Sequence, residues 1–325
     1  MKKNKDNITV IIRSVGERTE QACYNLLKNF FHEEQIVIVR ATPFSESIRQ
    51  SFKIAIDRAL PWTLCIDADV LVDIEQLPAL IQKAIQTDDN VLQVQGLVLD
   101  KFIPVIRPAG NHLYRTALMG KALEFIPEEG TSLRPETDML NEMSKQGYPW
   151  LQCDVLVGIH DFEQYYEDIY RKCFLQAHKH SYLIPLIEPY WIEKSSEDLD
   201  FKIAVMALNS GKIFSEKVFV DKKFLNVQAM EVLKMEHIQE KHSINSFDYV
   251  HETILEYQKS DFLKNHQERI FSTKNWNSLK ISVNQIDNQR HGLIFRTFHY
   301  FLYRMSSIKK YIKDKIKVSK WNILT

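Results

Sequence analysis

The chain has 325 residues, of which 45% are hydrophobic and 26% are charged, and its formal net charge is zero. This composition is typical of a folded globular protein and excludes a collagen-like, a disordered and a uniformly basic nucleic-acid-binding chain. The length suffices for one large domain with an extension, or for two ordinary domains. The sequence contains no run of about 18 apolar residues, so we expect no membrane-spanning segment.

The first half of the chain alternates between strand and helix signals. Short β-branched, apolar runs over 8–12, 36–39 and 62–66 predict buried strands. Between them, apolar residues at helical spacing predict one helix after Thr19 and another over about 45–60. Strands separated by helices in this way predict an α/β fold, with parallel strands joined by crossover helices.

Strand signals continue to about residue 160 and then fade. Residues 91–99 and 151–159 predict two more strands, 162–178 predicts a long helix, and Gly110–Arg115 is expected to form a loop that leads into a helix. Helical patterns dominate from about residue 190. We therefore expect three parts: an α/β domain over 1–190, a helical extension over 191–289 and a tail over 290–325.

Polar residues stand where the first three predicted strands end. They are Arg13 and Ser14 after the first strand, Arg40 and Thr42 after the second, and Asp67 and Asp69 after the third. Open parallel sheets bind their ligands beyond the carboxyl ends of the strands. The sequence therefore predicts a binding site at this edge of the sheet.

The strongest single motif is Asp67-Ala68-Asp69. Two carboxylates just past a buried strand can hold a hard divalent cation, Mg²⁺ or Mn²⁺, and leave coordination positions for substrate phosphates. The motif is short, and a second copy, Asp198-Leu199-Asp200, has no strand before it. The strand context favours metal binding at Asp67 and Asp69 over a solvated pair of turn residues.

In this context the sequence resembles the GT-A family of nucleotide-sugar glycosyltransferases, of the bacterial surface-glycan type. The resemblance rests on 8–12 with its polar loop, on 47–59 and on 62–70, and it extends loosely over 91–165. It implies a GT-A-like, Rossmann-like fold with a mostly parallel sheet, flanking helices and a helical C-terminal extension. It also implies that 1–190 is the catalytic domain, in which the D-x-D motif bridges a metal to the diphosphate of the donor.

Six residues are expected to contact the nucleotide sugar: Arg13, Ser14, Arg18, Arg49, Lys53 and Ala68. The four cations lie in segments aimed at the carboxyl edge, where they can form charge-assisted hydrogen bonds to phosphates. Ordinary surface positions are the alternative for each of them. Arg49 is favoured because the family resemblance places the donor against its helix.

Three further residues are candidates for the chemistry. His160 ends the strand over 151–159, and the resemblance makes it a third metal ligand; the alternative is a His that caps the next helix. Glu136 and Asp138 are candidates for the base that deprotonates an acceptor hydroxyl in an inverting transfer. Acids at a helix N-terminus are equally explained by the helix dipole, and a retaining enzyme needs no base there.

The tail over 290–325 carries nine Lys or Arg and a single Asp. Apolar residues recur every three or four positions from Ile294 to Ile316, which predicts a basic amphipathic helix suited to an anionic membrane surface. A helix packed on the protein itself would show the same stripe. Because the four cysteines are scattered and form no C-x-x-C pair, we expect a reducing compartment. The predicted location is cytoplasmic, peripherally associated with the inner face of the membrane.

Together these features predict a metal-dependent glycosyltransferase of polysaccharide biosynthesis, with a lipid-linked or cell-surface glycan as acceptor and no nucleic-acid partner. A nucleotidyltransferase is one alternative, but such enzymes normally carry a Gly-rich phosphate loop after the first strand, and 14–19 holds a single Gly. A haloacid-dehalogenase-like phosphatase is another, but its D-x-D motif belongs on the first strand, not the third. A non-catalytic membrane scaffold is the alternative outside enzymes, and metal-dependent donor hydrolysis would exclude it.

Overall fold

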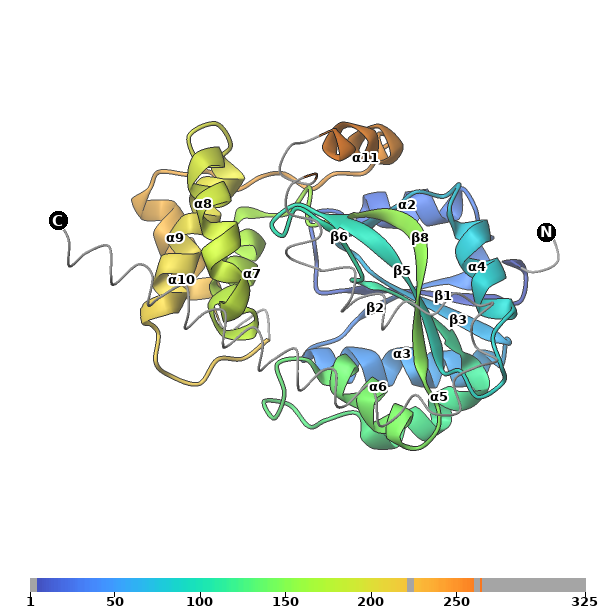
Figure 1. Ribbon diagram of the computed structural model, residues 1–325. Coiled ribbons are helices and arrows are strands. Elements are labelled where there is room, and N and C mark those ends of the chain that lie inside the picture. The colour runs from blue at the N-terminus through green and yellow to red at the C-terminus, as the bar shows by residue number, and fades with distance from the viewer. Residues whose placement is uncertain (1–4, 221–224, 260–263, 265–325) are drawn as a thin grey trace.

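The computed structural model describes residues 5–220, 225–259 and 264 (Figure 1). Within them, one eight-stranded sheet has the order β2-β1-β3-β7-β5-β8-β4, with β6 paired to β5. The strands are β1 (Ile8–Ser14), β2 (Ile36–Arg40), β3 (Trp62–Asp67), β4 (Val70–Val72), β5 (Gln93–Asp100), β6 (Ile106–Arg107), β7 (Asn111–Arg115) and β8 (Trp150–His160).

Five of these strands run in one direction. β1 is parallel to β2 and β3, and β5 is parallel to β8. β7 is antiparallel to both β3 and β5, so β3 and β5 point the same way. These five are the strands that the sequence predicts. The predicted fold class is confirmed: an α/β fold with a mostly parallel sheet, flanking helices and a helical extension.

Helices cover both faces of the sheet (Figure 1). On one side lie α2 (Glu20–Lys28) and α4 (Leu77–Ile85), and on the other α3 (Phe44–Arg58), α5 (Thr116–Ala122) and α6 (Pro135–Lys145). The β1 side chains alternate between the two apolar cores: Val10 and Ile12 face one, and Ile11 faces the other. All three are fully buried, as expected for a strand that is covered on both faces.

A group of helices lies beside the carboxyl edge of the sheet (Figure 1). It contains α7 (Tyr166–Lys179), α8 (Ile184–Lys194), α9 (Leu199–Ile213) and α10 (Asn226–Met235), and α11 (Val250–Gln258) returns to pack on β8. Short 3₁₀ turns are η1 (Glu33–Gln35), η2 (Leu123–Phe125) and η3 (Ser181–Leu183). α7 packs closely on α9, where a Cβ on Gly211 would lie 2.5 Å from the Phe174 carbonyl oxygen. The boundary at residue 190 stays a prediction, and the tail over 290–325 lies outside the described residues.

One expectation from the sequence is wrong. Gly110–Arg115 was expected to form a loop, but Asn111–Arg115 is strand β7 in the middle of the sheet. Its polar side chains resemble loop residues in the sequence. In the fold they are buried in the sheet, where hydrogen bonds to neighbouring strands satisfy them. Asn111 pairs through its side chain with the backbone of Gly96, and His112 Nδ1 lies 2.7 Å from Gln93 Nε2.

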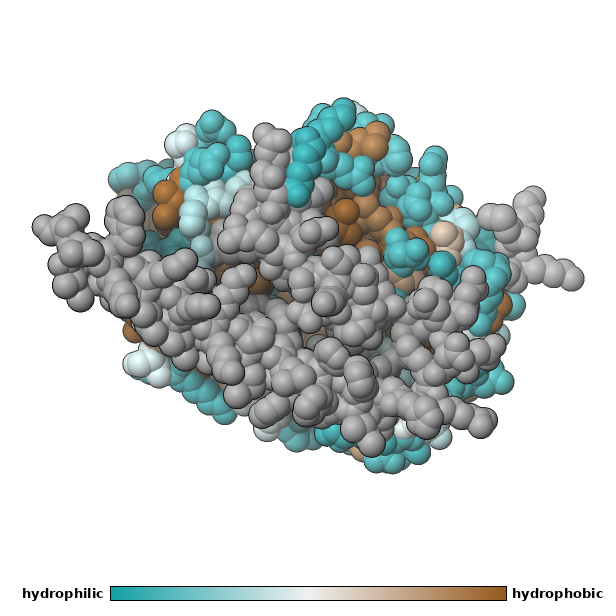
Figure 2. Space-filling view, viewed as in Figure 1, coloured by the Kyte–Doolittle hydropathy of each residue, from teal (hydrophilic) through white to brown (hydrophobic). Residues whose placement is uncertain are grey.

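On the face seen in Figure 2, most of the described surface is hydrophilic. Large apolar side chains that are more than half exposed occur mainly on the helical group, namely Ile192, Ile213, Val227, Met230 and Met235. The four cysteines are free and buried. Within the described residues, no helix has both the length and the apolar character needed to cross a bilayer.

Candidate functional site

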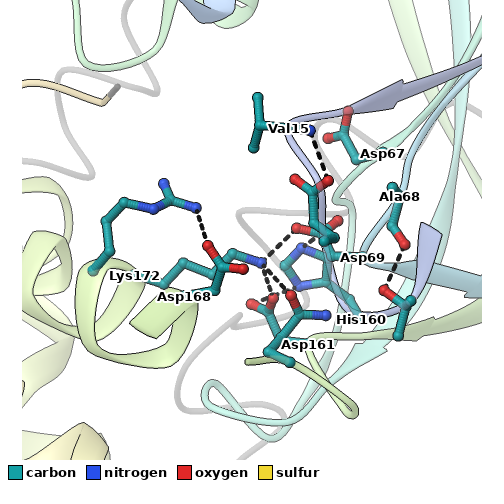
Figure 3. A network of polar contacts seen from close by, with 12 residues as sticks. Val15, Asp67, Ala68, Asp69, His160, Asp161, Asp168 and Lys172 are labelled. Carbon is teal, nitrogen blue, oxygen red and sulfur yellow. Dashed lines mark hydrogen bonds and ion pairs between the residues drawn. The ribbon is translucent and has the colours of Figure 1, made fainter. Parts of the chain in front are cut away.

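The Asp67-Ala68-Asp69 motif forms the turn between β3 and β4, at the carboxyl edge of the sheet. The backbone of the turn is fixed by two hydrogen bonds. Ala68 N donates to the Arg13 carbonyl oxygen at 2.9 Å, and Thr19 Oγ1 donates to the Ala68 carbonyl oxygen at 2.7 Å. Ala68 is completely buried. The turn therefore holds its two carboxylates in fixed places, and Figure 3 shows Asp67 apart from the polar network around Asp69.

The first carboxylate belongs to a buried cluster around Arg13, which is only 3% exposed. Arg13 Nε donates to Asp67 Oδ1 at 2.8 Å, and its two terminal nitrogens donate to Glu136 at 2.7 and 3.2 Å. Glu136 also accepts a hydrogen bond from Tyr114 Oη at 2.6 Å and lies 3.0 Å from His112 Nε2. We call Arg13, Asp67, His112, Tyr114 and Glu136 the buried arginine cluster.

The two acids of the buried arginine cluster differ in their pKa. Burial by itself raises the pKa of Glu136, but the charges of Arg13 and His112 outweigh it and hold that pKa well below the usual range. The pKa of Asp67 is raised, because burial outweighs its share of the Arg13 charge and because Asp69 and Glu136 are close. The Arg13 guanidinium thus pairs with two carboxylates, donating one hydrogen bond to Asp67 and two to Glu136.

The second carboxylate belongs to a different group on the β4–β8 side. In this pair of strands Val70 lies opposite His160, so the residue before β4 and the residue after β8 become neighbours. Asp161 N donates to the Asp69 carbonyl oxygen at 3.2 Å. One potential ligand atom from each of Asp69, His160 and Asp161 lies within 4.8 Å of the other two. We call these three residues the Asp69 cage.

His160 is oriented by a carboxylate outside the cage. Its Nδ1 lies 2.7 Å from Asp100 Oδ2, and its Nε2 lies 3.7 Å from Asp69 Oδ1. A carboxylate that holds the far nitrogen of an imidazole is a common arrangement around histidine metal ligands. Burial lowers the pKa of His160, but the charges of Asp161, Asp69 and Asp100 raise it above its ordinary value.

A lysine from α7 reaches into the cage. Lys172 Nζ lies 2.5 Å from Asp69 Oδ2, contacts Asp161 Oδ1 and lies 3.5 Å from Gln164 Oε1 (Figure 3). Although burial raises the pKa of Asp69, the Lys172 ammonium and His160 lower it to about 2. The acids in turn outweigh burial at Lys172 and raise its pKa. Asp69 and Lys172 therefore stabilise each other's charged forms.

The Asp69 cage fits a divalent metal ion. Asp69 Oδ1 is buried and has no hydrogen-bond partner among the described residues, although buried carboxylate oxygens are normally satisfied. Two carboxylates and one imidazole form a donor set that suits Mn²⁺ or Mg²⁺. Asp161 has a φ of +65°, which is uncommon for residues other than glycine and occurs often at functional sites. Asp67 is not part of this group, so its assignment as a ligand stays a prediction.

Of the predicted donor residues, Ser14 ends β1 and Arg18 lies in the loop between β1 and α2. Ser14 Oγ donates to Glu17 Oε2 at 2.7 Å, and Gly16 N donates to Ser14 Oγ at 2.9 Å. Arg18 contacts Glu163 and donates to the His242 carbonyl oxygen at 2.6 Å. Burial raises the pKa of Glu17 in this loop, and the negative charge of the nearby Asp69 raises it further.

Three other predicted residues have no contact with either cluster. Arg49 donates to the carbonyl oxygens of Leu123 and Ile126, at 3.4 and 2.7 Å, and so fixes the segment after α5. Lys53 is exposed on α3. Asp138 is exposed in the first turn of α6 and accepts a hydrogen bond from Ser132 Oγ at 2.5 Å. The roles of these residues at a donor or acceptor stay predictions.

Sequence reasoning missed four charged residues of the site: Glu17, Asp100, Asp161 and Lys172. Asp161 could have been found, because it follows His160 directly and carboxylates are common metal ligands. Asp100 also stands at the end of a predicted strand. No sequence signal points to Lys172, which is 103 positions from Asp69 and lies on a helix that is otherwise ordinary.

Comparison with known proteins finds a distant similarity to two solved structures. No family model and no curated protein matches it. It is similar to a glycosyltransferase involved in glycosylation of the major capsid of PBCV-1, with 15% identity, a TM-score of 0.31, and coverage of 45% of this chain and 82% of that one. It is also similar to a mannosyltransferase from Pyrobaculum calidifontis in complex with GDP-Man and Mn²⁺, with 11% identity, a TM-score of 0.33, and coverage of 83% and 87%.

Proposed function

We propose that the chain is a metal-dependent glycosyltransferase that uses a nucleotide-sugar donor. The observation that carries this proposal is the Asp69 cage, which lies on a GT-A-like sheet at the edge where such sheets bind ligands. The cage combines two carboxylates and an imidazole, and one of its buried oxygens, Asp69 Oδ1, has no hydrogen-bond partner within the residues that the structure describes. This is the environment expected for a hard divalent cation that must also accept substrate phosphates.

Asp69, His160 and Asp161 would hold Mn²⁺ or Mg²⁺. When bound, such an ion neutralises the diphosphate and stabilises the charge that develops as the nucleoside diphosphate leaves. Asp100 fixes the His160 ring so that Nε2 faces the cage. Arg13 holds Asp67, which is 27% exposed, beside the cage, and we propose that this carboxylate contacts the metal or the donor from there.

We propose that Ser14, Arg18 and the backbone at Ala68 line the donor site. Ser14 and Arg18 lie at the end of β1 and in the loop after it, and Ala68 lies in the turn between β3 and β4, next to the cage. Arg13 acts on the donor only through Asp67, since its nitrogens are already bonded within the buried arginine cluster. Arg49 binds backbone oxygens, so a role at the donor requires that it exchange those contacts.

The acceptor base was predicted at Glu136 or Asp138. Glu136 accepts hydrogen bonds from Arg13 and Tyr114, and a carboxylate with a strongly lowered pKa is a poor base. Asp138 is exposed and accepts a hydrogen bond from Ser132 Oγ at 2.5 Å. Of the two, we propose Asp138 for an inverting reaction and a positioning role for Glu136.

The phosphatase alternative would need Asp67 as a free nucleophile. Arg13 Nε occupies Asp67 Oδ1 at 2.8 Å, and the motif lies on β3 rather than on the first strand. Lys172 does lie at the site, as a lysine does in that class, so the alternative deserves a direct assay. Hydrolysis of a small phosphate ester that requires Asp67 but no nucleotide sugar would favour the phosphatase.

The experiment that tests the proposal compares two aspartate variants in calorimetric titrations of a panel of nucleotide sugars with Mn²⁺. Asp69→Asn should weaken Mn²⁺-dependent donor binding at least ~100-fold, because it removes a ligand atom and a charge from the cage. Asp154→Asn is the matched control: it lies on β8, as His160 does, and its side chain is 70% exposed. Donor affinity that is the same in the wild type and in Asp69→Asn would refute the proposal.

We further propose that the acceptor is a lipid-linked or cell-surface glycan reached at a membrane. Supporting this are the basic, amphipathic sequence over 290–325 and the exposed apolar side chains of α9 and α10, such as Ile213, Val227 and Met230. The full chain should co-sediment with anionic vesicles, less so at high salt. Binding that is equal on neutral vesicles would contradict an electrostatic contact.

A further inference from the structure

Lys172 stands where a metal ion would have to bind. Its ammonium lies between the two carboxylates of the Asp69 cage, 2.5 Å from Asp69 Oδ2 and in contact with Asp161 Oδ1. Lys172 comes from α7, an element outside the sheet, and its side chain is 16% exposed. The contact is therefore a buried, charge-assisted one rather than an ordinary surface ion pair.

An ammonium and a divalent ion cannot both use these oxygens. A protonated lysine has three donors and no lone pair, so it cannot become a metal ligand. Its positive charge also repels a second cation at contact distance, most strongly in a site shielded from water. Asp69 Oδ1 stays available to a metal, because it has no hydrogen-bond partner in the described part of the chain, and it lies 3.7 Å from His160 Nε2.

We infer that Lys172 is an internal counter-cation of the Asp69 cage and that divalent metal binds in competition with it. Without metal, the ammonium balances the charges of Asp69 and Asp161 and occupies the position between their carboxylates. Metal binding requires Lys172 to leave, which its flexible four-carbon chain permits. The inference deepens the proposed function, since it makes Lys172 a positioning residue that sets the metal affinity of the donor site.

The test measures Mn²⁺ binding by electron paramagnetic resonance in the full chain, without any donor. Lys172→Met keeps the length and apolar character of the side chain and removes its charge. It should bind Mn²⁺ at least ~10-fold more tightly than the wild type, because the competing cation is gone. Lys172→Arg, which keeps the charge, should bind Mn²⁺ no more tightly than the wild type. In the double variant Asp69→Asn, Lys172→Met the gain should disappear, which assigns it to the cage.

Lys83→Met is the matched control, because Lys83 also pairs with an aspartate, Asp154, at 3.3 Å but lies on α4. It should leave Mn²⁺ affinity unchanged. Equal or weaker Mn²⁺ binding in Lys172→Met would overturn the inference. Since no donor is present, this outcome is independent of whether the chain transfers a sugar.

A second measurement on the wild type covers the case in which Lys172→Met does not fold. Acylation of lysines, read by mass spectrometry, should show Lys172 protected without metal and reactive once Mn²⁺ occupies the site. Occupancy is followed in the same sample by the resonance signal. Unchanged protection of Lys172 at full occupancy would show that metal and ammonium coexist, and the inference would then fail.

Discussion

The two carboxylates of one short motif lie in two different environments. Asp67 shares the Arg13 guanidinium with Glu136, in a cluster where buried polar groups from three strands and α6 meet one another. Asp69, two residues later, shares the Lys172 ammonium with Asp161, and one of its buried oxygens has no hydrogen bond to any residue that the structure describes. The described residues supply hydrogen-bond partners for Arg13, Asp67 and Glu136 in the first environment, but none for Asp69 Oδ1 in the second.

The difference lies in the cation that each acid meets. Arginine presents five donors in a rigid plane and stays protonated, so it can bind two carboxylates permanently. Lysine presents a compact charge on a flexible chain, which can leave and be replaced. The buried arginine cluster therefore fixes the turn, and the Asp69 cage retains the capacity to bind a ligand. Each prediction below changes one side of this comparison.

The largest effect on stability is expected at Glu136. Glu136→Gln removes the charge that balances most of the buried Arg13, and breaking a buried ion pair from one side costs about 3 kcal/mol or more. The free energy of unfolding in urea should fall by that amount. Glu142→Gln on the same helix is the control: its side chain is 45% exposed, and we expect a change within about 0.5 kcal/mol. Loss of transferase activity at unchanged stability would instead make Glu136 a catalytic base.

The sequence predicted the parts of the fold that carry long apolar runs. All five strands that share one direction were found, because strands buried on both faces consist of continuous β-branched or apolar residues, as in Ile8–Ile12. The three antiparallel strands were missed. β4 and β6 have only three and two residues, and β7 contains Asn111, His112 and Tyr114, whose polar groups are satisfied across the sheet.

Site residues could be predicted from the sequence only where a residue type suited to metal binding stands at or just after the end of a predicted strand. Asp69 and His160 end predicted strands, so topology brings them to one edge, and both lie in the cage. The split between Asp67 and Asp69 depends on Arg13 and Lys172, and the partners of these cations lie 54 and 103 positions away. Periodicity and spacing carry no information on such pairs, because any of the other lysines would look the same in the sequence.

A second test acts on the strand pair that supports the Asp69 cage. A Cβ on Gly158 would lie 2.2 Å from the Leu71 carbonyl oxygen and 2.9 Å from Val72 Cα, and these backbone atoms belong to β4. Gly158→Ala must push β4 away from β8. We expect it to cost about 2 kcal/mol of stability and to weaken Mn²⁺ binding, since Asp69 precedes β4.

Gly120→Ala is the control for that substitution. On α5 the nearest atom to its added Cβ is Ile56 Cδ1, at 4.0 Å. Replacing a glycine by alanine within a helix should raise stability by about 0.5–1 kcal/mol. Undiminished Mn²⁺ affinity in Gly158→Ala would show that the cage does not depend on the β4–β8 pairing.

The last test looks for a difference in sign between the pH dependences of the two acids, measured in EDTA by urea unfolding between pH 3 and pH 6. The folded protein lowers the pKa of Asp69 from its usual 3.8 to about 2, so between about pH 2 and about pH 5 the folded state binds fewer protons at this carboxyl than the unfolded state. Asp69 therefore stabilises the fold above pH 4, by about 2 kcal/mol, and this contribution shrinks as the pH falls toward 2. The stability gap between the wild type and Asp69→Asn should narrow on acidification.

Asp67 should behave in the opposite way. Its raised pKa means that the folded state keeps a proton more readily than the unfolded state, so its contribution to stability falls as the pH rises from about 4 through the raised value. Relative to Asp67→Asn, the wild type should therefore lose stability as the pH rises, whereas relative to Asp69→Asn it gains. Because the two residues belong to one turn, general acid effects on the protein act on both variants alike and cancel in the comparison. Equal signs for the two aspartates would show that Arg13 and Lys172 act on them in the same way, and the distinction between the two clusters would be lost.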